Sequence, residues 1–239
     1  MYTISYKIRN KDVNMYREMR TSRLMEMLQE ICISHTQALG AGREKTLDKG
    51  ILWVVIQQHV DITRMPVYDE EIQISTWPGK TMHVLFPRYF RISSANEGIL
   101  ISGSAMWTLI DQTTRKMIFA DQAGIDVPGE VTGLETPLPK PVHQRETDNT
   151  AQFKVPFSYC DMNGHMNNAR YFDLAEDFLP IHDKHLQLVS FTTQYAEEIR
   201  FNELVKLAWK QEGNSFYFTG DKEKNCFRME LEYQEKTCQ

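Results

Sequence analysis

The predicted secondary structure of this chain repeats itself, which leaves few folds open to it. Apolar side chains recur at three- and four-residue steps through residues 17–39 and stop at Gly40, which predicts an amphipathic helix. Segments rich in β-branched and aromatic residues follow and predict strands: WVVIQQHVDI, EEIQISTW, HVLFPRYFRI and ILISGSAMWTLID. The second half shows a similar order, with a helix predicted over 168–179 and strands in FKVPFSY, VSFTTQYAEEIRF, LVKLAWK, SFYFTG and CFRMELEYQ.

Two short internal alignments support a duplication. YDEEIQISTW (68–77) resembles FNELVKLAWK (201–210), and KDVN (11–14) resembles CDMN (160–163) just before each helix. Together with the matching order of elements, they predict an α+β chain built from two copies of one unit, in which each antiparallel sheet wraps around a helix. This arrangement is the tandem, or double, hot-dog fold.

A change in composition separates the two units. Between residues 119 and 150 the chain carries many glycines and prolines and little apolar periodicity, which is typical of a linker. We therefore expect three parts: an N-terminal repeat at 1–120, a linker at 121–150 and a C-terminal repeat at 151–239.

Composition and charge argue against several functional classes. The 239 residues are 41% hydrophobic and 25% charged, which is typical of a globular protein. The formal net charge is -5, and the absence of any dense Lys/Arg block argues against nucleic-acid binding. No apolar run approaches the roughly 20 residues that a membrane-spanning helix needs, so we expect no membrane insertion.

The N-terminus and the cysteines favour a cytoplasmic protein. The first residues, MYTISYKIRNKD, lack the apolar stretch of a signal peptide. The cysteines lie far apart and form no CxxC pair, so we expect neither a disulfide framework nor a structural zinc site. Reduced thiols are expected at all four positions: Cys32, Cys160, Cys226 and Cys238.

The segment CDMNGHMNNARYFDLAED (160–177) concentrates polar side chains before a helix. Four of them alternate as loop ligands of a metal do: Asp161, Asn163, His165 and Asn167. A calcium-binding EF-hand loop needs glycine at its sixth position and a carboxylate at its twelfth, where this chain has Met166 and Phe172. Zinc prefers His and carboxylates to Asn. We therefore expect no metal, and we expect His182 and His185 to cap or follow the helix, outside the site.

A cysteine nucleophile is the second interpretation of this segment, because Cys160 lies five residues before His165. Consecutive residues of a strand point to opposite faces, so Cys160 and Asp161 should not share a pocket. Cysteine is also among the most frequently buried residue types. The sequence favours a packing role for Cys160.

The third interpretation is a polar site at a helix N-terminus, where free N–H groups favour negative charge. Such donors polarise a bound thioester carbonyl and stabilise the oxyanion that forms when water attacks. His165 and Asn163 can position substrate or water there, with Asp161 fixing their orientation. The alternative is an Asx-rich helix cap without chemistry. From the residues alone, both interpretations stand.

A hydrolase also needs a base, and TTQYAEEIRF offers Glu197 and Glu198. The two side chains face opposite sides of a strand, so one can enter a pocket between helix and sheet while the other stays in water. The alternative is that both are exposed at a strand end.

Five segments together carry a resemblance to a known family: LMEMLQEICISHTQALG, LWVVIQQHVDITRMPVYDEEIQISTWP, SAMWTLIDQTTRKM, DMNGHMNNARYFD and QYAEEIRF. Nearly the whole chain resembles the acyl-acyl carrier protein (acyl-ACP) thioesterases of bacteria and plant plastids. The resemblance implies a tandem hot-dog fold. It also implies hydrolysis of the thioester between a fatty acyl chain and the phosphopantetheine arm of acyl carrier protein, which terminates chain elongation, without a metal or bound cofactor.

The resemblance extends to the site residues. The family's Asp-x-Asn-x-His matches Asp161, Asn163 and His165, and its glutamate three residues after a tyrosine matches Glu198, which selects Glu198 over Glu197. Plant members carry a cysteine directly after this glutamate, where this chain has Ile199. A cysteine mechanism at that position is therefore excluded, and water activated by Glu198 or His165 becomes the better hypothesis, with Asp161 and Asn163 as orienting groups.

The resemblance assigns a different task to the first repeat. This repeat carries Asp12 and Asn14 but Tyr16 near the place of His165, so we expect one active site per chain. The acyl chain is expected against the helix face that includes Met25, Leu28 and Cys32, although ordinary core packing explains each of these residues equally well.

The expected partner is an acidic carrier protein, which predicts a basic surface that includes Arg170 or Arg200, unless these are ordinary solvated charges. Three alternatives remain open at this point: an acyl-CoA thioesterase, a hydratase or dehydratase on the same fold, and a non-hydrolytic acyl-binding protein. Both a monomer and a homodimer are compatible with the duplication.

Overall fold

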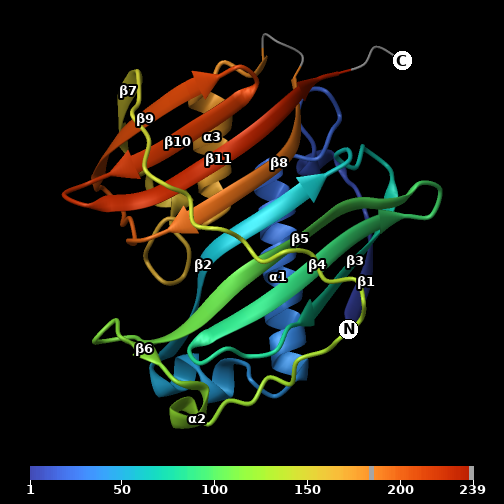
Figure 1. Cartoon of the computed structure of the whole chain (residues 1–239), viewed down its shortest axis with the longest axis vertical. Coiled ribbons are helices and arrows are strands. Elements are labelled where there is room, and N and C mark those ends of the chain that lie inside the picture. The colour runs from blue at the N-terminus through green and yellow to red at the C-terminus, as the bar shows by residue number, and fades with distance from the viewer. Residues whose placement is uncertain (183–185, 237–239) are drawn as a thin grey trace.

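The computed structural model describes residues 1–182 and 186–236, so His185 and Cys238 lie outside the described residues. Figure 1 shows the arrangement of the elements. The helices are α1 (Thr21–Ala38), α2 (Ala120–Ala123) and α3 (Arg170–Phe178), with 3-10 turns η1 (Asn10–Asp12), η2 (Arg43–Lys45), η3 (Leu47–Lys49) and η4 (Phe157–Tyr159). The strands are β1 (Tyr2–Lys7), β2 (Ile51–Ile62), β3 (Glu71–Pro78), β4 (Leu85–Ser94), β5 (Gly98–Asp111), β6 (Met117–Ile118), β7 (Asn149–Lys154), β8 (Leu186–Tyr195), β9 (Leu204–Glu212), β10 (Ser215–Asp221) and β11 (Asn225–Glu235).

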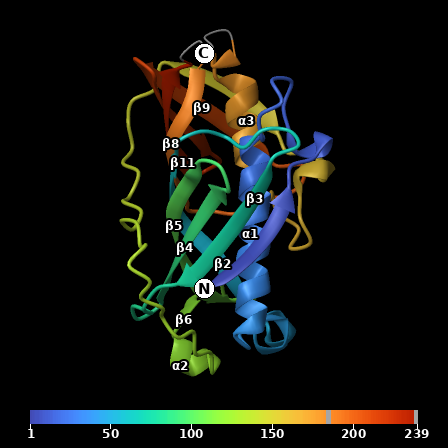
Figure 2. The same ribbon diagram turned by 90° about the vertical axis from the view of Figure 1, so that its right-hand side faces the viewer.

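The strands form one continuous antiparallel sheet with a symmetric order. The order is β1-β3-β4-β5-β2-β8-β11-β10-β9-β7, with β6 paired to β5 beside this path. Each first-half strand on this path therefore has a counterpart at the mirrored place in the second half. Figures 1 and 2 show α1 and α3 on one face of this sheet, each packed against its own half.

The two halves meet where β2 pairs with β8. His59 lies opposite Thr192 at the centre of this pairing, and its Nδ1 lies 2.8 Å from the Thr192 hydroxyl. Gln58 lies opposite Thr193, and Val60 lies opposite Phe191. The pairing is therefore symmetric about His59 and Thr192, and it makes Gln58 equivalent to Phe191 and Val60 equivalent to Thr193. The two sheets expected from the sequence are thus joined edge to edge, and neither leaves its β2 or β8 edge unpaired.

The helices bury one face each, as their sequence periodicity predicts. Helix α1 buries Leu24, Leu28 and Ile31 against the sheet and ends before Gly40, whose positive φ of +72° suits glycine. It is shorter than the predicted 17–39, because residues before Thr21 form a turn. The core of the second half is built from aromatic side chains: Tyr171, Phe172, Phe191, Phe218 and Phe227.

The register of the strands tests the proposed duplication. Lys7 of β1 lies opposite Glu71 of β3, and Lys154 of β7 lies opposite Leu204 of β9. The alignment of 68–77 with 201–210 is therefore in register with the structure. Strand β1 was not predicted, and FKVPFSY is not a strand throughout: β7 ends at Lys154, and η4 follows Pro156.

The alignment of KDVN with CDMN is wrong by two residues. Val13 forms an isolated bridge with Met19, as Cys160 does with Met166. The equivalent pairs are therefore Asn14 and Asp161, Tyr16 and Asn163, and Glu18 and His165. Asp12 has a different task, because its buried carboxylate accepts hydrogen bonds from Tyr6, Arg9 and Arg23.

The connection after α2 runs across the face of the sheet opposite the helices (Figure 2). Residues 125–147 of this connection contain no helix or strand. Side chains of the sheet fix it: Ser104 donates to Pro137 O at 2.6 Å, and Gln194 Oε1 accepts from the Val142 N–H at 3.0 Å. Among the helices of the described residues, none has the length and apolar character that crossing a membrane requires.

Candidate active site

The segment DMNGH forms a tight turn that fixes two of the predicted site residues. The Asp161 carboxylate accepts the Asn163 N–H at 2.8 Å, and the Asp161 N–H donates to His165 O at 3.0 Å. Gly164 occupies the turn position with a φ of +79°, which other residues adopt at a cost. The spacing of the motif therefore follows from the turn, which puts Asp161 and His165 at its two ends.

A second segment is held against this turn by the backbone. The Met166 N–H donates to Ile199 O at 2.7 Å, and His165 pairs with Arg200 as an isolated bridge. This pairing brings the connection between β8 and β9 next to the turn. It positions Glu198 beside the histidine.

The imidazole of His165 lies between two carboxylates. Its Nε2 is 3.5 Å from Glu198 Oε1, and its Nδ1 is 3.9 Å from Asp161 Oδ1. All three side chains are between 18% and 29% exposed, so they are partly shielded and still open to substrate. The imidazole ring therefore has a carboxylate facing each of its two nitrogens.

Glu198 is the glutamate that contacts His165. Its other oxygen, Oε2, accepts a hydrogen bond from Arg115 at 2.5 Å and lies 3.9 Å from Arg200. Lys222 donates to the backbone oxygen of Glu198 at 2.9 Å. Glu197 instead lies 3.9 Å from the exposed Lys224.

Asn163 lies beside these groups without a side-chain partner of its own. Its side chain is exposed and lines the same pocket as Asp161 and His165. No hydrogen bond of its amide to another described residue is present. The four predicted site residues are therefore together at one pocket.

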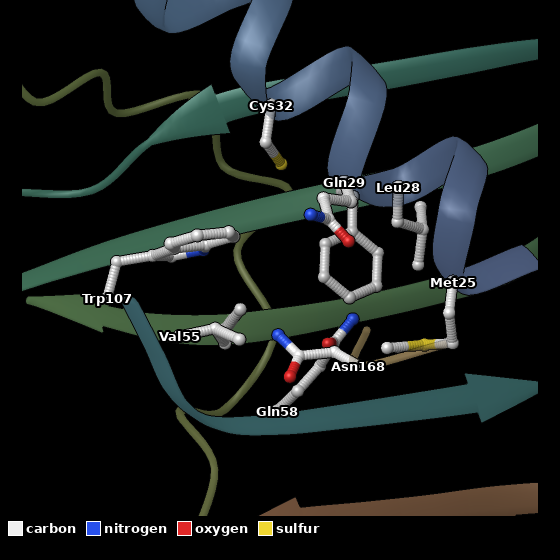
Figure 3. A pocket seen from close by; sticks show the side chains of 10 residues that line it. Met25, Leu28, Gln29, Cys32, Val55, Gln58, Trp107 and Asn168 are labelled. Atoms are coloured by element: carbon white, nitrogen blue, oxygen red, sulfur yellow. The ribbon is translucent and has the colours of Figure 1, made fainter. Parts of the chain in front are cut away.

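This pocket is large and is built by both repeats. It has a volume of about 970 Å³ and continues from His165 and Glu198 to Trp53 and Phe86 in the first half. Cys32 of the predicted helix face lines it directly. Met25 and Leu28 line a small adjoining void of about 20 Å³ together with Cys32 (Figure 3).

Cys160 lies outside the pocket, as predicted, although it follows η4 and does not belong to a strand. Its thiol points to Pro156 O at 3.9 Å, and the residue does not line the cavity. Burial and the neighbouring Asp161 carboxylate raise the pKa of the Cys160 thiol, which lowers its thiolate fraction. His182 follows α3, with its Nε2 3.0 Å from Glu176 O, and does not reach the site.

No group of three or more His, Cys, Asp or Glu side chains within residues 1–182 and 186–236 has an arrangement that can hold a metal ion. The donor set around His165 consists of two carboxylates, one of which already pairs with Arg115. The arrangement suits proton transfer.

Three residues of the site were missed by the sequence analysis: Arg115, Lys222 and Asn168. Arg115 follows β5 in the first repeat and reaches Glu198 across 83 residues of sequence. Its position in TTRKM looks like an ordinary turn, so no local signal points to it. Asn168 is the first residue of the predicted helix 168–179, but α3 begins at Arg170. Asn168 lines the pocket, and its backbone oxygen lies 3.5 Å from the Tyr195 hydroxyl.

Comparison with protein families agrees with the two-repeat structure. Residues 1–122 match the acyl-ACP thioesterase N-terminal domain, and residues 142–236 match the acyl-ACP thioesterase C-terminal domain. The chain belongs to the acyl-ACP thioesterase family. As a member of this family, it is 24% identical over 211 residues to the chloroplastic palmitoyl-acyl carrier protein thioesterase of Cuphea hookeriana.

That match covers 81% of this acyl-ACP thioesterase family member and 51% of the plant protein, so the chain spans about half the length of the curated relatives it matches. The fold also matches solved structures. The acyl-ACP thioesterase from Bacteroides thetaiotaomicron superposes with a TM-score of 0.81 at 19% identity, over 98% of this chain and 97% of that chain. The 12:0-ACP thioesterase from Umbellularia californica superposes with a TM-score of 0.82 at 18% identity, over 98% and 97% of the two chains. The predicted tandem hot-dog fold is confirmed.

Proposed function

We propose that the protein hydrolyses fatty acyl-ACP to a free fatty acid and holo-ACP and thereby terminates chain elongation. The observation that carries the proposal is the His165 imidazole, held between Asp161 and Glu198 in the lining of a pocket of about 970 Å³. The substrate itself is inferred from the family. Without a polar group such as this at one end, the pocket would suit binding alone.

In the proposed mechanism, His165 acts as the general base. Its Nε2 takes a proton from water, the water oxygen attacks the thioester carbonyl carbon, and an oxyanion forms. The carbon–sulfur bond then breaks, and the His165 proton passes to the thiolate of the phosphopantetheine arm. We assign the base to His165 because the Arg115 guanidinium already pairs with the carboxylate of Glu198, whereas the His165 ring forms no hydrogen bond within the described residues.

Asp161 and Asn163 orient the reacting groups in this mechanism. Asp161 holds the turn and faces Nδ1 of His165, while the free Asn163 amide can bind the water or the thioester. The N–H of Asn168 precedes α3 and donates no hydrogen bond within the described part of the chain, which makes it a candidate donor to the oxyanion. The positive end of the α3 dipole adds to this effect.

We propose that the two repeats divide the work. Residues 151–239 contribute the reacting groups, residues 1–120 contribute most of the acyl-chain pocket, and 121–150 link them. At the positions of His165 and Glu198, the first repeat has Glu18 and Met65. Glu18 forms an ion pair with Lys236 at 2.9 Å. These residues support one active site per chain.

Arg200 is the better candidate for docking of the acidic carrier protein. It lines the pocket, and its side chain is 64% exposed. Arg170 forms ion pairs with Glu26 and Asp173 at 2.8 and 2.7 Å, which neutralise its charge. Steering of an acidic partner depends on charge that is free at the surface.

The decisive experiment measures thiol release from matched acyl-ACP and acyl-CoA substrates of several chain lengths. We expect faster release from acyl-ACP, a loss of about 10²- to 10⁴-fold in kcat for His165→Ala, and a smaller loss for Glu198→Gln. His182→Ala is the matched control, because this exposed histidine lies outside the pocket. Better use of acyl-CoA would assign the runner-up function, and release of neither thiol would leave a lyase or an acyl-binding protein.

The proposal includes a cytoplasmic location and either a monomer or a homodimer. The free thiols of Cys32, Cys160 and Cys226 are compatible with a reducing compartment. The paired arrangement of two repeats is already complete within one chain. Light scattering on the purified protein distinguishes the two oligomeric states.

A further inference from the structure

A cluster of three carboxamides lies where an alkyl chain alone would need none. Gln29 of α1, Gln58 of β2 and Asn168 before α3 line the void of about 20 Å³ together with apolar side chains. Figure 3 shows their amide groups turned toward this space. The apolar lining includes Met25, Leu28, Phe90 and Ala105.

The amides of this cluster have no protein partners. None of the three side chains forms a hydrogen bond with another residue in the described ranges. Gln58 is only 5% exposed, while Gln29 and Asn168 are partly buried. A largely buried amide without a protein partner is costly to leave unsatisfied, so the void favours a polar occupant.

The void adjoins the active-site pocket. Five residues line both spaces: Gln29, Cys32, Val55, Trp107 and Asn168. Asn168 follows His165 by three residues, and its backbone oxygen lies 3.5 Å from the hydroxyl of Tyr195, three residues before Glu198. Two members of the cluster, Gln29 and Asn168, therefore also line the pocket that contains the reacting groups.

The second repeat shows what the same place looks like when it is filled. The symmetric pairing of β2 and β8 makes Phe191 the equivalent of Gln58. The matching bridges before the two helices make Phe172 the equivalent of Met25. The rings of Phe172 and Phe191 pack at 4.6 Å, and both are fully buried. The first repeat instead keeps an amide and a space large enough for one oxygen-bearing group or one water.

We propose that the carboxamide cluster of Gln29, Gln58 and Asn168 binds an oxygen substituent near the thioester, so that the preferred substrates are 3-hydroxyacyl or 3-oxoacyl chains. This inference rests on the proposed function. Carboxamides both donate and accept hydrogen bonds, so the cluster suits a hydroxyl and a keto oxygen alike. A plain alkyl chain leaves the amides unsatisfied or traps a water there.

The test compares kcat/KM for 3-hydroxymyristoyl-ACP, 3-oxomyristoyl-ACP and myristoyl-ACP. We expect a preference for an oxygenated chain on the order of tenfold in the wild type. Gln58→Met, which keeps the volume and removes the amide, should abolish this preference and improve use of the plain chain. Gln57→Met is the matched control, since Gln57 bonds to Gln194 and does not line either space.

Two outcomes overturn the inference. Equal or better use of myristoyl-ACP, with a ratio unchanged in Gln58→Met, means that the cluster holds a water only. If Gln58→Met does not fold, Gln29→Met serves the same comparison.

If no acyl-ACP is hydrolysed, the proposed function fails, and a binding experiment decides the inference separately. Tryptophan fluorescence is titrated with 3-hydroxymyristate and with myristate, because Trp107 lines the void. Equal affinity for the two fatty acids then overturns it.

Discussion

Glu198 is held by residues that belong to different repeats. Arg115 of the first repeat pairs with one carboxylate oxygen, while His165 of the second faces the other. The reacting groups thus depend on the closed arrangement of both halves, although the motif itself is local. This division explains why a five-residue motif does not make a site by itself.

Cys160 gives a prediction at the residue scale. Cys160→Ala should retain at least about half of the wild-type kcat, because the thiol lies outside the pocket and its pKa is raised by burial and Asp161. The measurement is the rate of thiol release, together with labelling by iodoacetamide. A loss as large as that of His165→Ala would restore the cysteine mechanism.

The sequence predicted this site unevenly. Asp161, Asn163 and His165 follow from the turn chemistry of one short segment, and the geometry keeps them together. The choice of Glu198 over Glu197 needed the family resemblance, because strand alternation leaves both open. Arg115 and the amide of Gln58 depend on pairings between distant segments, which neither periodicity nor spacing encodes.

At the scale of single elements, α1 carries an unusual buried group at its C-terminal end. His35 is buried and its Nδ1 lies 3.0 Å from a guanidinium nitrogen of the buried Arg88, which also donates to Thr36 at 3.0 Å. Burial and this cation lower the pKa of His35 from 6.5 to about 4. The folded helix therefore holds the imidazole neutral.

The low pKa of His35 predicts a pH-dependent stability. Since the unfolded chain binds this proton more tightly, the free energy of unfolding rises with pH between about 4 and 6.5. The contribution is complete above 6.5 and is lost as the pH falls toward 4, with a size of roughly 3 kcal/mol at ~1.4 kcal/mol per pKa unit. Urea unfolding of the wild type and His35→Gln at several pH values checks this. Parallel pH curves for the two proteins would argue against it.

The elements themselves were predicted more accurately than their ends. Strands β2 to β5 and helices α1 and α3 were predicted from the sequence, but α1 begins at Thr21 because the preceding residues pair as a bridge between Val13 and Met19. Such a bridge is a backbone contact without a side-chain pattern. The alignment of KDVN with CDMN was wrong by two residues for the same reason, because only the bridges Val13–Met19 and Cys160–Met166 show which residues are equivalent.

At the scale of the whole molecule, the continuous sheet should hold the halves together without the connecting chain. Cleavage near Val131, which is 95% exposed, should leave both fragments associated, because β2 and β8 pair over five residues and Arg170 reaches Glu26. Size-exclusion chromatography of the nicked protein should show one peak containing both fragments. Separate elution under native conditions is the contrary outcome.

The nicked protein should also retain most of the proposed thioesterase activity, since no residue of the connection forms a hydrogen bond or ion pair with His165 or Glu198 within the described structure. The duplication, read from the order of elements, predicted this architecture. The sequence could not show that the two sheets would fuse at β2 and β8, because an edge pairing depends on backbone groups that every strand possesses.

The symmetric pairing of β2 and β8 has an evolutionary consequence. Two identical subunits joined in this way would have to change both of their pockets with every mutation. Fusion into one chain removes that coupling, so the copy with Gln58 can diversify while the copy with His165 stays under constraint. A laboratory selection for new fatty acid products can therefore be confined to the first gene half, provided that Arg115, which pairs with Glu198, is kept.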